Sequence, residues 1–402
     1  MKNRICIVGG GNIGLYLSCE LNELNPVLYC SKPENRIKEY RCNDILEKKE
    51  KKVYLRNMTD NLSTAVKNKK LIIVTLPANV RIKFLNELLK FIEDETIVCF
   101  ITGFGGAELL ADKFLEKKCI ITGFQRSPYI CRSDKNEVYL LGKRREVYLG
   151  SIPFDEVFLA REVLSNILNL NIKCVPNYLS VTLTPTNPIM HVPRLYQMYK
   201  EYKEGMAYEN EFFYEDWTDE ASSIVLKCEK EMSKFIEQLK NIDKRGMHTV
   251  FKYFGAETVS EYTKKMKEFP AFKGIKSPVK FEKNGYIPDF ESRYFLEDIP
   301  YGLVLYKSFF KLSNYKSEEI DKLIEFFQKY LNKDYIDKNG DLGEDAKDVL
   351  KPQDVGINTI EELEEFYMQS NHLRTLEEKN KFIKNNFLEE LNIKETIKMG
   401  GE

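Results

Sequence analysis

Two short segments in the second half of this 402-residue chain carry side chains that can move protons and bind an anion. His191 follows an Asn-Pro turn that begins at Asn187, within what should be the first turn of a helix. Later in the chain, residues 288–302 gather Arg293 and Asp298 among aromatic side chains. An imidazole exchanges protons near neutral pH, a carboxylate can orient it, and a guanidinium can hold a substrate carboxylate through two hydrogen bonds. This set suggests acid–base chemistry on a carboxylate substrate. A core or capping histidine and a structural Arg–Asp ion pair are the alternatives.

The beginning of the chain carries a second chemical signature. A short apolar strand runs directly into a Gly-x-Gly-x-x-Gly turn, and a helical stretch follows at once. In such a turn the first glycine permits the tight bend, the second leaves room for a pyrophosphate, and the third lets the helix pack closely. The N–H groups at the helix start then face the phosphates. The sequence therefore predicts a dinucleotide-binding turn made by Gly9, Gly11, Asn12, Ile13 and Gly14.

The end of the second expected strand indicates which dinucleotide is bound. NAD-binding versions of this turn place a carboxylate there, about 20 residues past the glycines, to accept the ribose 2′-hydroxyl. This chain has Ser31 and Lys32 instead, with Arg36 a turn later, and Glu34 stands beyond a proline. A hydroxyl and two cations suit a 2′-phosphate, so NADPH is predicted over NADH. The third expected strand ends at Thr75, two residues before Pro77. Thr75 and Pro77 would lie along the adenosine or pyrophosphate edge of the cofactor.

The elements that position these residues differ between the two halves of the chain. Residues 1–185 alternate short apolar strands with helical segments, which predicts a Rossmann-type, doubly wound parallel sheet. The strands are expected at Arg4–Val8, Pro26–Cys30, Leu71–Thr75, Thr96–Phe100, Cys119–Thr122 and Ile172–Pro176. Val138–Gly142 and Glu146–Gly150 are expected to pair with each other at the sheet edge, with residues 143–145 at the hairpin tip.

Residues 186–402 have a different texture, and we expect them to form a mostly α-helical domain. Apolar residues recur there at helical spacing within long charged segments. The helices are expected at Ala221–Lys240, Thr258–Lys267, Ser317–Leu331, Ile360–Gln369 and Arg374–Leu391. The segment Phe269–Tyr301 is too rich in Pro, Gly and aromatic residues for a simple linker, and long loops of this kind are often functional.

Composition argues against several other classes of protein. A net charge of −1 offers no general attraction to nucleic acid or to an anionic membrane. The Lys runs at residues 48–52 and 67–70 are interpreted as solvated faces beside helices. No stretch approaches the roughly 20 apolar residues of a membrane span, and the first residues are expected to form a core strand rather than a cleavable leader. Nine cysteines without a CxxC pair and three widely spaced histidines favour a cytoplasmic protein with reduced thiols and no metal site.

Several of these segments resemble one known family. Asn187-Pro-x-x-His191 resembles the NPxxH motif of the octopine/nopaline (opine) dehydrogenases, and residues 292–302 are similar to their SRY-x-x-ED-x-PYG block. Residues 128–132 are similar to the PW-x-CR segment, with Tyr129 at the aromatic position. Residues 124–128, 213–219 and 287–295 are more similar to the opine-metallophore branch, the staphylopine- and pseudopaline-type dehydrogenases.

The resemblance implies a reductive condensation: the primary amine of an amino-acid-derived substrate adds to an α-keto acid, water leaves, and NADPH reduces the imine. His191 would be the general acid/base, Asp298 its orienting carboxylate, and Arg293 the holder of a substrate carboxylate. In the metallophore branch the amine is an aminobutyrate-extended amino acid, and the keto acid is pyruvate or 2-oxoglutarate. Further substrate contacts would come from Asn187, Arg126, Arg132, Tyr214 and Trp217. The family places Pro directly after the His, whereas Val192 stands there in this chain.

Several alternatives stay open at this point. The chain can be a plain opine synthase that uses a common amino acid, a 2-hydroxy-acid or ketopantoate-type reductase that needs no amine, or a nicotinamide-sensing regulator without catalysis. The resemblance also implies a homodimer formed by the helical half. The enzyme itself should need no metal, because any metal would bind the product after export.

Overall fold

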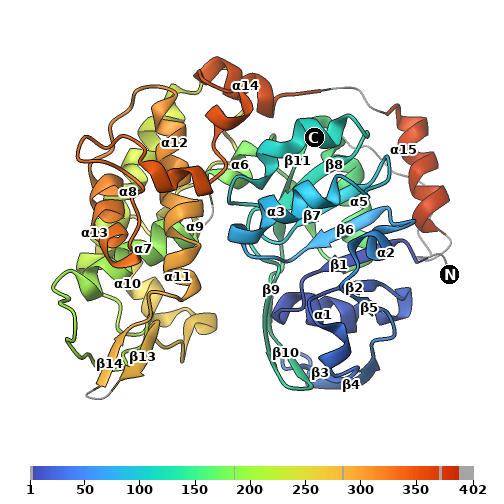
Figure 1. Cartoon of the computed structure of the whole chain (residues 1–402), viewed down its shortest axis with the longest axis horizontal. Helices are drawn as coiled ribbons and strands as arrows, with labels where there is room; N and C mark the ends of the chain where they lie inside the picture. The colour runs from blue at the N-terminus through green and yellow to red at the C-terminus, as the bar shows by residue number, and fades with distance from the viewer. Residues whose placement is uncertain (1–2, 185, 283–284, 371–373, 389–402) are drawn as a thin grey trace. The chain divides into compact units, whose positions relative to one another are not determined.

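The computed structural model describes residues 3–184, 186–282, 285–370 and 374–388, and the chain forms two compact units (Figure 1). The first unit contains residues 1–103, 110–181 and 367–402, and the second contains residues 104–109 and 182–366. The C-terminal segment thus clusters with the first unit, whereas the sequence analysis placed all of residues 186–402 in one helical domain.

The first unit is built on an eight-stranded sheet with the strand order β12-β11-β8-β7-β6-β1-β2-β5. Its neighbouring strands run parallel, except that β11 is antiparallel to β8. The strands are β1 (Ile5–Val8), β2 (Val27–Tyr29), β5 (Met58–Thr59), β6 (Leu71–Val74), β7 (Ile97–Phe100), β8 (Ile120–Phe124), β11 (Val147–Ile152) and β12 (Ile172–Cys174). All six expected strands are present, and the Rossmann-type fold of this half is confirmed.

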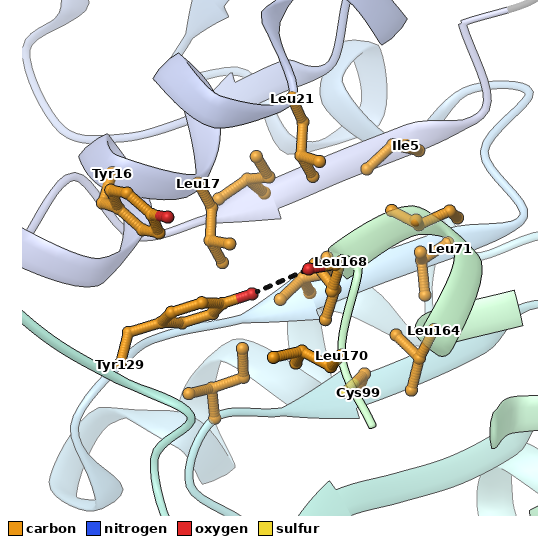
Figure 2. Close-up of a cluster of buried hydrophobic side chains, with 14 of the residues drawn as sticks. Ile5, Tyr16, Leu17, Leu21, Leu71, Cys99, Tyr129, Leu164, Leu168 and Leu170 are labelled. Carbon is orange, nitrogen blue, oxygen red and sulfur yellow. Dashed lines mark hydrogen bonds between the residues drawn. The ribbon is translucent and has the colours of Figure 1, made fainter. Parts of the chain in front are cut away.

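Helices cover both faces of this sheet because its central strands are apolar on both sides. On one face, α1 (Asn12–Glu20) and α5 (Val157–Leu168) contribute leucines and Tyr16 to a common core with β1, β6 and β7, as Figure 2 shows. The phenol of Tyr129 joins this core and donates to the carbonyl oxygen of Leu168 at 3.4 Å. Shorter helices of the unit are α2 (Leu62–Val66), α3 (Ala78–Leu88) and α4 (Ala111–Leu115).

A second sheet in this unit was not expected from the sequence. It has the order β4-β3-β10-β9 and consists of β3 (Glu39–Asp44), β4 (Lys49–Tyr54), β9 (Tyr129–Asp134) and β10 (Glu137–Lys143). The predicted pairing of Val138–Gly142 with Glu146–Gly150 is wrong, because β10 pairs with β3 and β9 whereas β11 belongs to the large sheet. The Lys run at residues 48–52 lies in a turn and in the edge strand β4, and Lys51 contacts Glu20 at the end of α1 at 2.8 Å. An edge strand with a single buried side chain leaves almost no hydrophobic pattern in the sequence.

The C-terminal segment joins the first unit through apolar and ionic contacts. In α15 (Leu376–Ile383) and the π-helical turn Lys384–Leu388, Phe382 and Phe387 enter the same core as α1 and α5. Arg374 and Lys379 both lie 3.4 Å from the carboxylate of the fully buried Glu156. The remainder of the expected tail helix and His372 lie outside the described residues.

The second unit is mostly helical, as predicted. Figure 1 shows α7, α8 and α13 side by side in it. Its helices are α7 (Asn187–Tyr199), α8 (Asp219–Gln238), α9 (Val250–Phe254), α10 (Val259–Glu268), α11 (Arg293–Leu296), α12 (Leu305–Lys311), α13 (Glu319–Leu331) and α14 (Ile360–Tyr367), and α6 (Leu179–Thr182) precedes them. A π-helical segment, Ile299–Val304, leads into α12. A hairpin of β13 (Val279–Glu282) and β14 (Gly285–Pro288) interrupts the helices, within the irregular segment that the sequence singled out.

Local sequence explains where the long helices begin. Thr218 caps α8 by accepting the N–H of Ala221, and Thr258 and Glu261 form a reciprocal capping box at α10. Helix α13 buries apolar side chains at the i, i+3, i+4, i+7 spacing of one helix face: Ile320, Leu323, Ile324 and Phe327.

Three further findings concern thiols, metal sites and membrane spans. The nine cysteines are all free, and eight of them are buried, which fits the prediction of reduced core thiols. Within the described residues, no group of three or more His, Cys, Asp or Glu side chains is placed to hold a metal ion. In the same part of the chain, no helix is both long and apolar enough to traverse a bilayer.

Candidate active site

His191 lies in the second turn of α7, which begins at Asn187. The helix begins with Asn-Pro as expected and continues through Pro193, so the displaced proline does not change the helix entry. The exposed side chain of Asn187 accepts the hydroxyl of Thr186 at 3.4 Å. The imidazole of His191 is turned inward and is 9% exposed.

Asp298, the carboxylate predicted to orient the imidazole, lies beside His191. Its Oδ2 lies 2.7 Å from Nδ1 of His191. The contact holds the proton of the neutral ring on Nδ1 and leaves the lone pair on Nε2. Burial raises the pKa of Asp298, and the nearby His191 opposes that rise. A buried carboxylate with one strong partner is thus positioned to stabilise an imidazolium when His191 takes up a proton.

The two sequence segments meet because one glycine lets them pack closely. Gly302 lies in the π-helical segment after Asp298, and a Cβ placed on it would come within 2.4 Å of Cβ and Cγ of Pro188. Pro188 is three residues before His191 in α7. The Asn-Pro turn and the Pro-Tyr-Gly turn are therefore in direct contact, and this contact aligns Asp298 with His191.

The second ring nitrogen of His191 also has a partner. The hydroxyl of Tyr214 lies 2.8 Å from Nε2. Tyr214 was predicted only as a secondary substrate contact, so the structure gives it a more central place. Burial raises the pKa of this phenol well above its ordinary value, with further contributions from Tyr294 and Asp298. The phenol is therefore protonated, and it donates to Nε2 when the ring proton of His191 lies on Nδ1.

Aromatic rings enclose the imidazole and the phenol. The ring of Tyr294 lies 4.7 Å from the ring of His191, and Phe213 meets the imidazole edge-on at 5.5 Å. Trp217 was expected to touch substrate, but it is fully buried and its indole N–H donates to Ser222 Oγ at 3.0 Å. Trp217 is therefore part of the packing behind the site.

Arg293, the predicted carboxylate clamp, lies at the start of α11 with its side chain 76% exposed. Its guanidinium binds one oxygen of Glu297, with Nε at 2.8 Å and Nη2 at 2.5 Å. The Glu297 side chain is only 6% exposed, so it restrains one side of the guanidinium while the rest faces solvent. The exposed N–H groups of Arg293 leave room for the predicted contact with a substrate carboxylate.

Sequence reasoning missed Arg194, which is 1% exposed in α7. Its Nε donates to the carbonyl oxygen of Phe213 at 3.1 Å, directly before Tyr214, and its Nη2 lies 3.4 Å from Glu211. Burial lowers the pKa of this guanidinium. The only available signal was an arginine one turn after His191 on an apolar helix face.

The glycine turn of the first unit has the geometry of a dinucleotide cradle. Gly9 has a φ of +109°, and a Cβ on Gly14 would lie 1.8 Å from the carbonyl oxygen of Gly9. A Cβ on Gly11 would meet nothing within 4 Å, so the space in front of the helix start is open. The first N–H groups of α1, from Asn12 and Ile13 onward, face this space. The residues present therefore fit a bound pyrophosphate.

Arg36, one of the residues predicted to contact NADPH, lies across the same turn. Its Nη1 donates to the carbonyl oxygen of Gly10 at 3.0 Å and its Nε to that of Ser31 at 3.3 Å. Ser31 and Lys32 are exposed directly after β2, and Lys32 has a φ of +50°. One hydroxyl and two cations therefore gather at the end of β2.

The remaining predicted residues differ in burial and in contacts. Thr75 supports the turn, because its hydroxyl donates to the carbonyl oxygen of Val8 at 2.9 Å, and Pro77 is the N-cap of α3. Asn12 accepts the hydroxyl of Ser133 at 2.6 Å. Arg126 and Arg132 belong to the first unit, where Arg126 is buried and Arg132 is exposed on β9. Their contact with a substrate near His191 stays a prediction.

The second unit also contains a cavity of about 310 Å³ that borders α8. None of the His191 group lines it, and its walls include Ile189, Glu229, Met232, Lys244 and His248. The candidate site formed by His191, Asp298 and Tyr214 is therefore separate from this cavity.

Two protein-family models match this chain, one in each half. Residues 174–331 match the family model of the α-helical domain of NAD/NADP octopine/nopaline dehydrogenases. Residues 5–153 match the family model of ketopantoate reductase PanE/ApbA.

Individual proteins agree with these matches. The tauropine dehydrogenase of Arabella iricolor is 23% identical over 396 residues, which cover 89% of this chain and 99% of that protein. A structure of octopine dehydrogenase with NADH and L-arginine superposes with a TM-score of 0.77 at 19% identity and covers 92% of this chain and 99% of the other. A structure of yersinopine dehydrogenase with NADP+ superposes with a TM-score of 0.55 at 14% identity, over 82% of this chain and 90% of the other. These identities are low, so the superpositions show the fold.

Taken together, the comparisons support the octopine/nopaline dehydrogenase family. They indicate an NAD(P)H-dependent oxidoreductase that acts on a CH–NH bond.

Proposed function

With the octopine/nopaline dehydrogenase family as the premise, we propose that this chain joins an amino-acid-derived primary amine to an α-keto acid and reduces the resulting imine with NADPH. The main support is the His191–Asp298 pair, which places an oriented imidazole in the helical unit. The motif that carries this pair matches the family whose helical-domain model spans residues 174–331.

The residues divide the work as follows. Carbinolamine formation and dehydration each need a group that gives and takes a proton near neutral pH, which is the role of His191. Asp298 stabilises the imidazolium that forms after proton uptake. Arg293 holds the keto-acid carboxylate through its exposed N–H groups.

The cofactor is held by the first unit. Gly9, Gly11 and Gly14 cradle the pyrophosphate, and Arg36 with Lys32 binds the 2′-phosphate. Bound NADPH supplies the hydride that reduces the imine carbon. NADPH over NADH is supported by the two cations and the lack of a carboxylate at the end of β2.

Two classes of amine compete for the substrate role. The resemblance of residues 213–219 and 287–295 to the metallophore branch favours an aminobutyrate-extended amino acid. The match to a tauropine dehydrogenase along almost its whole length favours a small, common amine. We propose the metallophore substrate first, and a plain opine synthase is the second candidate. Homodimer assembly and a cytoplasmic location stay predictions.

The test uses keto-acid-dependent NADPH oxidation with a panel of amines, followed by mass spectrometry of the product. His191→Asn should reduce turnover at least a hundredfold, whereas His248→Asn, an exposed histidine of the same unit, should leave it unchanged. Arg293→Lys should mainly raise KM for the keto acid. Full turnover by His191→Asn would remove His191 from the reaction. Oxidation of NADPH without any amine would point to a simple keto-acid reductase.

A further inference from the structure

Both ring nitrogens of His191 are engaged. Nδ1 is bound to Asp298 at 2.7 Å and Nε2 to the hydroxyl of Tyr214 at 2.8 Å. An acid–base histidine normally directs one nitrogen at the reacting group. In this site the phenol oxygen occupies the position, relative to Nε2, that a substrate oxygen would otherwise take.

Tyr214 is held in that position by its surroundings. Its ring stacks on Phe272 at 4.0 Å with an interplanar angle of 12°, and Trp217 lies parallel to it at 6.0 Å. The side chain is 4% exposed. Arg194 fixes the preceding peptide by donating to the carbonyl oxygen of Phe213. Rotation of the phenol away from His191 would break this stack, so a direct approach of substrate to Nε2 is disfavoured.

We propose that Tyr214 is the catalytic group that touches the substrate oxygen, and that its phenol relays the proton between that oxygen and Nε2 of His191. The inference rests on the proposed condensation. During dehydration, the Tyr214 O–H proton moves to the carbinolamine hydroxyl, the C–O bond breaks, and water leaves. The phenol oxygen takes the Nε2 proton of the imidazolium in the same step. Tyr214 ends as a phenol, His191 ends neutral, and the nitrogen lone pair forms the C=N bond of a protonated imine, which now carries the positive charge.

The electrostatics of the site support a concerted transfer. Burial strongly disfavours a phenolate at this position, and the carboxylate of Asp298 adds to this effect. A proton can therefore leave one side of the phenol only as another arrives on the other side. Tyr214 acts as a relay and not as an independent base.

A competing role is a gate, in which the phenol covers Nε2 at rest and moves aside when substrate binds. The two roles predict opposite results when only the hydroxyl is removed. Tyr214→Phe keeps the ring and its stacking. A relay then loses its proton path, whereas a gate leaves Nε2 more accessible.

The experiment compares the full-length Tyr214→Phe, His191→Asn and Tyr286→Phe variants in the amine-dependent assay, with NADPH affinity and thermal melting as checks on folding. Tyr286→Phe removes a phenol hydroxyl from strand β14 of the same unit and serves as the matched control. We expect Tyr214→Phe to lose at least a hundredfold in kcat, with KM for the keto acid changed less than threefold. A loss of less than tenfold in kcat, or a gain, would overturn the relay.

Fluorotyrosine incorporated at position 214 gives an independent readout, because it keeps the hydrogen bond and lowers the phenol pKa. The relay predicts a changed kcat and a shifted pH profile, whereas unchanged values would contradict it. The measurement also decides the outcome if Tyr214→Phe melts early. An active His191→Asn variant would refute the proposed function itself. An inactive His191→Asn together with an active Tyr214→Phe would refute the relay alone.

Discussion

Oδ2 of Asp298 lies 2.7 Å from Nδ1 of His191, although 107 positions separate the two residues in the chain. The carboxylate is buried, and the contact selects the tautomer in which Nε2 can accept a proton. The chemistry proposed for this protein depends on that contact.

Asp298→Asn should therefore impair turnover more than binding. An amide can donate its N–H to Nδ1 and so favour the opposite tautomer, which removes the base from Nε2. We expect kcat to fall about 10²- to 10⁴-fold, with KM for both substrates changed only slightly. Steady-state kinetics measures this. Glu291→Gln, an exposed carboxylate ahead of α11, is the control, and a kcat within threefold of wild type for Asp298→Asn would contradict the assignment.

Gly302→Ala should separate the two segments that carry the pair. The new Cβ would come within 2.4 Å of Pro188, so the π-helical segment or α7 has to shift. Overpacking of this kind costs about 1–3 kcal/mol, and the shift also lengthens the His191–Asp298 contact. Thermal melting and kcat should both fall. The double variant Pro188→Gly/Gly302→Ala, which removes the clashing atoms, should recover part of kcat; no recovery would mean that this contact does not set the alignment.

Alanine substitutions at Gly11 and at Gly14 of the nucleotide turn should have different effects on stability and on NADPH affinity. Gly11→Ala places a Cβ in open space, so the fold should keep its Tm while NADPH affinity falls at least about tenfold, because the methyl group occupies the pyrophosphate position. Gly14→Ala puts a Cβ 1.8 Å from the carbonyl oxygen of Gly9 and should lower Tm as well. Fluorescence titration and thermal melting distinguish the two. Unchanged NADPH binding by Gly11→Ala would argue against a cofactor in this cradle.

Arg36→Leu should change the choice of cofactor. The guanidinium lies across the glycine turn next to Ser31, where the 2′-phosphate is expected. Loss of a charge-assisted contact of about 1.5–3 kcal/mol should raise Kd for NADPH about 10- to 100-fold and leave NADH within threefold. Titration with both nucleotides measures this, with Arg41→Leu on β3 as the exposed control. An equal loss of affinity for NADPH and NADH would mean that Arg36 supports the glycine turn and does not bind the 2′-phosphate.

Glu229 should make the stability of the protein depend on pH. Burial raises the pKa of this carboxyl to about 7, although the N–H groups of Val250 and Phe251 oppose the rise. Its pKa in the folded state is above the ordinary value of 4.5, so the folded state holds the proton more tightly. The stabilisation is complete below about pH 4.5 and is lost as pH rises through about 7, which amounts to at most about 3 kcal/mol.

Urea unfolding at pH 5 and pH 8 tests this dependence. Glu229→Gln mimics the protonated side chain and should remove this group's part of the loss at pH 8. Glu237→Gln on the exposed side of α8 is the control and should keep the wild-type difference. The same difference in Glu229→Gln as in wild type would show that another group is responsible.

The large sheet of the first half and the short runs that carry the candidate site residues could be predicted from the sequence, because they depend on near neighbours. The strand–glycine–helix order at Gly9, Gly11 and Gly14 follows from backbone sterics within a few residues. The period of apolar residues similarly predicts α8 and α13. His191, Asp298 and Arg293 could be named because each stands in a short, distinctive run.

Only the tertiary structure decided which of these residues meet and what else joins them. Tyr214 at Nε2 of His191 and Pro188 against Gly302 are long-range contacts without a periodic signal in the sequence. The same holds for the hairpin β3–β4, whose edge strand is nearly all polar, and for the C-terminal helix, which buries Phe382 and Phe387 in the first unit. Side-chain spacing records which face of an element is apolar, but the partner of that face is selected by the packing of the whole chain.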